Sequence, residues 1–201
     1  MERFQAAGKD RSLGNHKPCR ATACRRPAGG PNLSPARAQF QASLHAVTLS
    51  GMAHQQRLRI GRASLPGQAY HVISATQARR PVFAVPEVAR VVIRVMRDMH
   101  DGGWLHSHAW VLMPDHLHWL FTLGVRANLS GTVNRFKSAS AHAVRGLDPR
   151  TSPVWQAGFF DHGVRQEEEL RGIARYIVAN PLRAGLCERV GDYPWWDVEW
   201  L

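Results

Sequence analysis

Hydrophobic and polar positions follow two different periodicities along the chain, and together they predict seven elements. Residues 70–76 are rich in β-forming side chains and follow the Pro66-Gly67 pair, so they predict an opening strand. From Pro86 onward the apolar side chains recur at helical spacing, which predicts an amphipathic helix ending near residues 102–103. Its apolar positions are Val88, Val91, Val92, Val95, Met96 and Met99.

The rest of the chain continues the same alternation of strands and helices. Residues 104–113 and 116–123 flank the turn-type pair Pro114-Asp115, which predicts an antiparallel strand pair. Asn128 is suited to cap a second helix that runs to about residue 144. Residues 155–164 predict a further strand, and residues 166–179 predict a third helix. The order β-α-β-β-α-β-α predicts an α+β fold, an antiparallel sheet with helices packed mainly on one face.

Residues 1–51 differ in composition from the rest of the chain. They hold eight Lys and Arg against two acidic residues, and they contain no Trp, Tyr or Ile. Such a segment cannot bury enough apolar surface to offset its ordering entropy, so we expect a disordered basic arm. The alternative is that translation begins at Met52 and that these residues are an artefact of gene-start choice. Either way, we expect the compact domain within residues 52–201.

The formal net charge of +11 favours a polyanionic partner, and nucleic acid is the first candidate. No run approaches the roughly 18 apolar residues of a membrane-spanning helix, and the first residues lack the apolar stretch of a secretory signal. We therefore expect a cytoplasmic, nucleoid-associated protein without a membrane partner. Three cysteines without paired spacing predict neither a disulfide framework nor a thiolate zinc site.

Two histidines form the first candidate site. His116 and His118 are two residues apart in a predicted strand, so both side chains leave the same face of the sheet. Two converging imidazoles suit a divalent cation bound through one nitrogen of each ring. The alternative is a pair of half-buried strand histidines without a ligand.

The second candidate site lies in the third predicted helix. Tyr176 falls on a flank of the apolar stripe rather than at its centre, and Asn180 projects beside it one helical turn later. The amide oxygen of Asn180 could reach the same ion. Two simpler alternatives are a partly exposed helix tyrosine and, for Asn180, a helix end imposed by Pro181.

Three ordered blocks of sequence carry a family resemblance: PDHLHWLF, WQAGFFDHGVRQEEEL and YIVANPLRAGL. Together they resemble the single-tyrosine HUH transposases that act on single-stranded DNA, specifically the REP-associated tyrosine transposases. The resemblance covers about residues 55–196 and implies a ferredoxin-like fold of the HUH endonuclease type. It implies that His116, His118 and Asn180 bind a divalent metal and that Tyr176 is the nucleophile. Oxygen-assisted sites of this kind suit Mg²⁺ or Mn²⁺.

The function implied by the resemblance is metal-dependent cleavage and rejoining of single-stranded DNA through a 5′-phosphotyrosyl intermediate. The implied target is a DNA hairpin of the repetitive extragenic palindrome type. A competing hypothesis is a domesticated protein that binds such hairpins without cutting them. A general RNA-binding module is a third hypothesis, and the sequence shows no aromatic RNP-type motif to favour it.

Basic and aromatic side chains could supply the DNA contacts. Five cations could follow a phosphate backbone: Arg135, Lys137, Arg165, Arg175 and Arg183. Three tryptophans near the end of the chain could either stack on unpaired bases or cover one edge of the core: Trp195, Trp196 and Trp200. His162 is a candidate general base, with a hydrogen-bonded strand histidine as the alternative.

Overall fold

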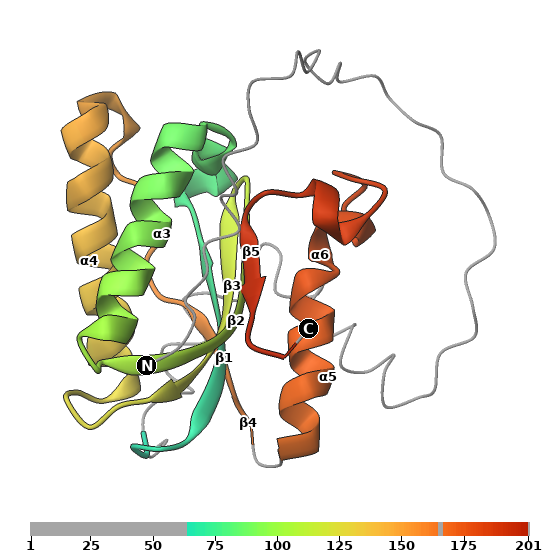
Figure 1. Cartoon of the computed structure of the whole chain (residues 1–201). Coiled ribbons are helices and arrows are strands. Elements are labelled where there is room, and N and C mark those ends of the chain that lie inside the picture. The colour runs from blue at the N-terminus through green and yellow to red at the C-terminus, as the bar shows by residue number, and fades with distance from the viewer. Residues whose placement is uncertain (1–63, 165–166, 201) are drawn as a thin grey trace.

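A computed structural model describes residues 64–164 and 167–200, with the backbone alone for Glu167 and Glu168. A five-stranded antiparallel sheet forms its centre, in the order β4-β1-β3-β2-β5 (Figure 1). The strands are β1 (Ala69–Ala75), β2 (Leu105–Met113), β3 (His116–Leu123), β4 (Phe160–Val164) and β5 (Trp196–Val198). The expected arm, residues 1–51, lies outside the described residues, as does Arg165.

Helices cover both faces of this sheet (Figure 1). The long helices are α3 (Pro86–Asp101), α4 (Leu129–Leu147) and α5 (Glu167–Val178), and the short α6 (Asn180–Arg183) follows α5. Single 3₁₀ turns occupy Gln77–Arg79, Val82–Ala84, Pro149–Thr151 and Val190–Asp192. Helices α3 and α4 lie together on one face, and α5 lies on the other. No helix in the described part of the chain is long and apolar enough to cross a membrane.

Two apolar cores follow from this arrangement, because successive strand side chains point to opposite faces. Trp119 and Phe121 of β3 point toward α3 and α4, where they pack with Phe136. Leu120, between them, points toward α5 and packs in a second core that includes Ile177. Both faces of the central strand are therefore buried, which fixes its register.

The predicted order of elements and the α+β fold class are confirmed, although the helices cover both faces of the sheet rather than mainly one. The Asn128 cap is also present, since its Oδ1 accepts a hydrogen bond from the Gly131 amide at 2.7 Å. The predicted strand at residues 155–164 is only partly correct. Trp155 makes an isolated bridge to Thr76, and Gly158 takes a positive φ of 72° before regular pairing begins in β4. Strand β5 was not predicted.

The β2–β3 hairpin positions the candidate site. Its turn is the predicted Pro114-Asp115 pair, and Met113 pairs with His116 while Val111 pairs with His118. On the other side of β3, strand β1 pairs in a register that places His71 beside the His118 ring, on the face covered by α5.

Candidate active site

The imidazoles of His116 and His118 converge, as their spacing predicts. Their Nε2 atoms are 3.1 Å apart, and both rings lie on the sheet face covered by α5. His118 is 5% exposed, while the His116 side chain is 16% exposed. His116 is therefore the more accessible of the two rings.

The other nitrogen of His116 is held by a carboxylate. Asp115 Oδ1 lies 2.6 Å from His116 Nδ1, and its second oxygen pairs with Arg79 Nε at 3.1 Å. Burial acts to raise the pKa of Asp115, but the hydrogen bond from His116 and the charge of Arg79 outweigh it and leave that pKa below its usual value. An ionised Asp115 accepts a hydrogen bond from the Nδ1–H group of His116. The lone pair on His116 Nε2 is then available to a metal ion.

The other nitrogen of His118 is held by a third histidine that the sequence did not reveal. His71 Nε2 lies 3.1 Å from His118 Nδ1, and the two rings stack at 5.3 Å. His71 is fully buried, and burial together with the nearby His162 lowers the pKa of His71 to about 3. Burial and the neighbouring histidines also lower the pKa of His118 well below its usual value. Both rings are thus neutral, the state that a ligating histidine requires.

These donors fit a shared divalent ion. The two Nε2 atoms face each other, while each Nδ1 is occupied by an outer partner, an arrangement typical of ligating histidines. Two ligands at right angles around an ion with bonds of about 2.1 Å lie about 3.0 Å apart, close to the observed separation of the two nitrogens. The residues present therefore suit the metal that the resemblance implies.

Tyr176 lies against this pair, on α5. Its ring meets the His118 ring edge-on, with 6.4 Å between centroids and 75° between planes. Burial raises the pKa of the Tyr176 phenol, and the nearby Arg183 only partly opposes that shift. The phenol is consequently neutral at physiological pH and needs assistance to act as a nucleophile.

Asn180 and Arg183, which follow the end of α5, both contact Tyr176. Arg183 places its guanidinium carbon 3.9 Å from the Tyr176 ring centroid and donates to the Tyr176 carbonyl at 2.7 Å. Asn180 donates its side-chain amide to the carbonyls of Tyr176 and Ile177, at 3.3 and 3.0 Å. Asn180 thus caps α5, the alternative that the sequence left open, and only its Oδ1 remains to serve as a metal ligand.

The predicted DNA-binding cations have different surroundings. Arg175 is exposed on α5. Arg135 lies 4.2 Å over the ring of Trp104 and is also exposed. Lys137 donates to the carbonyls of Gln156 and Gly158, at 2.5 and 2.6 Å, so it anchors the segment before β4. This contact gives Lys137 a structural role, and its predicted role as a DNA-binding cation stays a prediction.

The three tryptophans near the end of the chain mostly cover the core. Trp195 packs against the α3 side, and Trp196 packs on the α5 side while donating to the Val190 carbonyl at 2.9 Å. Trp200 is 37% exposed and stacks on His108. The candidate base His162 lies on β4, where its Nε2 is 3.2 Å from Glu169 Oε1.

Comparisons with known proteins identify the family of this chain. Residues 64–180 match the family described as Transposase IS200 like. A REP-associated tyrosine transposase from Escherichia coli (strain K12) is 31% identical over 104 residues, which span 51% of this chain and 58% of that protein. A solved REP-associated tyrosine transposase bound to a REP hairpin shares the fold, with a TM-score of 0.54, 24% identity, and coverage of 67% of this chain and 79% of that one. Because the family match covers more than half of its residues, this chain belongs to the IS200-like transposase family.

Proposed function

We propose that this protein is a metal-dependent endonuclease and strand transferase that acts on hairpins in single-stranded DNA, of the REP type. The observation that carries the proposal is the convergence of two imidazole nitrogens, 3.1 Å apart, beside the ring of a tyrosine on the facing helix. His116, His118 and the Oδ1 of Asn180 are the proposed ligands of Mg²⁺ or Mn²⁺. When bound, such an ion supplies Lewis-acid polarisation of the scissile phosphate.

The proposed chemistry is transfer of a phosphoryl group to Tyr176. The phenolic oxygen gives up its proton to solvent water and attacks phosphorus in line, forming a 5′-phosphotyrosyl bond as the bond from phosphorus to the 3′ oxygen breaks. The departing 3′ oxygen takes up a proton and becomes a free hydroxyl. Attack by another 3′-hydroxyl reverses the step and joins two strands without a nucleotide cofactor.

Arg183 supports the nucleophile in this proposal. Its guanidinium lies over the Tyr176 ring and opposes the rise in phenol pKa that burial causes. A positive charge held at this place stabilises the phenolate that forms during attack. Because Arg183 also donates to the Tyr176 carbonyl, it fixes the helix end that presents the nucleophile.

The proposed substrate rests on two supports. The family relatives include a REP-associated tyrosine transposase, and the solved relative was bound to a REP hairpin. On this chain, Arg175 and Arg135 present exposed positive charge on α5 and α4. Exposed positive charge of this kind attracts the phosphate backbone of a nucleic acid.

An experiment with labelled hairpin DNA tests the proposal. Incubation with Mg²⁺ or Mn²⁺ should yield a shortened strand and a protein–DNA adduct that survives denaturation. Chelation, His116→Ala and His118→Ala should each remove most of both products, while Asn180→Ala should reduce them less because water can replace one neutral oxygen ligand. Tight hairpin binding with no adduct under any divalent ion would instead support the non-cleaving binding protein.

A further inference from the structure

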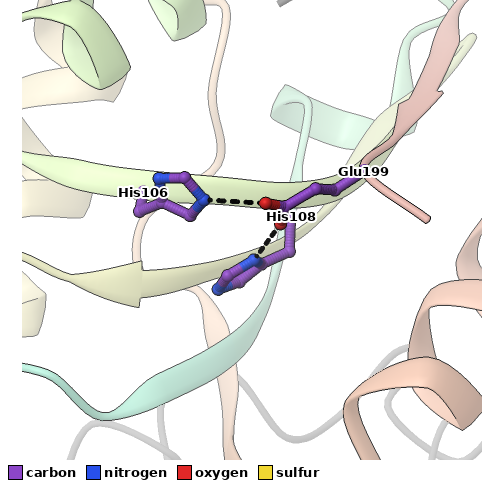
Figure 2. Close-up of side chains that lie close together, drawn as sticks. All are labelled: His106, His108 and Glu199. Carbon is purple, nitrogen blue, oxygen red and sulfur yellow. Dashed lines mark hydrogen bonds and ion pairs between the residues drawn. The ribbon is translucent and has the colours of Figure 1, made fainter. Parts of the chain in front are cut away.

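A second cluster of metal-ligating side chains lies at the opposite end of β2 from the hairpin turn. His106 and His108 belong to β2, and Glu199 follows β5, which pairs with β2. Ser107 points to the other face, where its hydroxyl accepts a hydrogen bond from Trp119 Nε1 at 2.9 Å. The two rings and the carboxylate point toward one another (Figure 2).

The candidate ligand atoms of these three residues all lie within 4.8 Å of one another. Glu199 bridges the rings, with Oε2 at 2.7 Å from His108 Nδ1 and Oε1 at 3.3 Å from His106 Nε2 (Figure 2). The side chains of His106 and Glu199 are 53% and 41% exposed, so an ion can enter from solvent. Water can then complete its coordination.

A hydroxyl from the neighbouring strand holds the far side of His108. His108 Nε2 lies 2.7 Å from Thr122 Oγ1 on β3. The 2.7 Å contact between His108 Nδ1 and Glu199 Oε2 is a hydrogen bond that Nδ1 donates. In the tautomer whose Nε2 donates to the Thr122 hydroxyl, the Nδ1 lone pair becomes available to an ion bound between the ring and the carboxylate. Such outer contacts, which fix the tautomer and the ring orientation, accompany almost all metal-binding histidines.

We propose that His106, His108 and Glu199 form a second metal site, which takes zinc or a similar transition ion. Two imidazole nitrogens and one carboxylate are donors that zinc accepts. The site is separate from the His116 and His118 pair. Thr122, beside His108, is four residues from His118 along β3, which corresponds to roughly 13 Å.

The structure also indicates what this ion does. Strand β5 has only three residues, and among the described strands it pairs with β2 alone. The Glu199 amide adds one further hydrogen bond, to the His108 carbonyl at 2.9 Å. An ion shared by Glu199 and the two β2 histidines joins this short edge strand to the sheet. The ion therefore has a structural role in this proposal, and the proposal does not depend on the transposase chemistry.

Zinc content and thermal stability test the proposal on the full chain. Bound metal is first removed with a chelator and by dialysis, and zinc is then added back. Bound zinc per chain and the rise in Tm are measured for wild type and for Glu199→Gln, His106→Gln and His108→Gln. Each variant should hold one zinc fewer than wild type and should lose most of the Tm rise. Thr122→Val should keep the site but weaken its zinc affinity by about 10- to 100-fold.

Two control variants test whether the loss of zinc depends on the His106, His108 and Glu199 cluster. His142→Gln removes an exposed histidine of α4 outside the cluster and should bind as much zinc as wild type. His116→Ala with His118→Ala should leave this zinc in place. The bound zinc of each variant is compared with that of wild type, because Cys19, Cys24 and other side chains can also bind zinc. Equal zinc content and equal Tm rise in wild type and Glu199→Gln would overturn the proposal.

Discussion

The Nε2 atom of His71 lies 3.1 Å from Nδ1 of His118, inside the layer between the sheet and α5. This contact leaves His118 one free nitrogen, the one that faces His116. His71 thus sets the orientation of a proposed metal ligand without ligating the metal itself.

Replacing His71 should separate this positioning role from simple packing. His71→Leu removes the partner of a buried nitrogen and should weaken metal affinity by about 10- to 100-fold. It should also lower the free energy of unfolding by about 1–3 kcal/mol. His71→Gln can place an amide oxygen near the former Nε2 position and should recover part of the metal affinity. Titration calorimetry with Mn²⁺ and chemical denaturation measure the two effects. Equal Mn²⁺ affinity in the leucine and glutamine variants would contradict a hydrogen-bonding role.

Asp115 should act in the same way on the other ligand. Asp115→Asn keeps the shape of the side chain but removes the charge that favours a proton on His116 Nδ1. We expect weaker Mn²⁺ binding, by about 10- to 100-fold, with little change in the fold. Asp98→Asn, on α3 at the opposite face of the sheet, is the matched control and should bind Mn²⁺ as wild type does. An unchanged affinity in Asp115→Asn would show that the carboxylate does not support the ligand.

The sequence could predict the order of the elements because their apolar periodicities are strong. It could also place His116 and His118 on one face, since that follows from alternation within a single strand. It could not predict their partnership with His71, because that contact depends on the register between β1 and β3. Glu199 was missed for a similar reason. A three-residue strand has too few positions to show a periodic pattern, and its pairing with β2 joins segments that are far apart in the sequence.

The cations singled out from the sequence should divide into two classes. Lys137→Met leaves two carbonyls without their donor and should lower the free energy of unfolding by about 1–3 kcal/mol. Arg175→Gln, on the exposed side of α5, should leave stability within about 0.5 kcal/mol of wild type.

Hairpin affinity provides the complementary measurement for the arginine. Arg175→Gln should weaken binding and reduce the slope of log affinity against log salt by about 1, because one phosphate contact is lost. Thermal denaturation and binding titrations over a range of salt concentrations provide both readouts. A salt slope identical to wild type would remove Arg175 from the proposed DNA surface.

Identification of the residue that becomes joined to DNA tests the proposed strand-transfer chemistry. Wild-type protein is incubated with a labelled single-stranded hairpin and Mg²⁺ and then digested, and the DNA-bearing peptide is located by mass spectrometry. We expect a phosphotyrosyl bond at Tyr176, and Tyr176→Phe should keep the fold and hairpin affinity but form no adduct. An adduct on another residue, or undiminished cleavage by Tyr176→Phe, would contradict the proposed role of Tyr176.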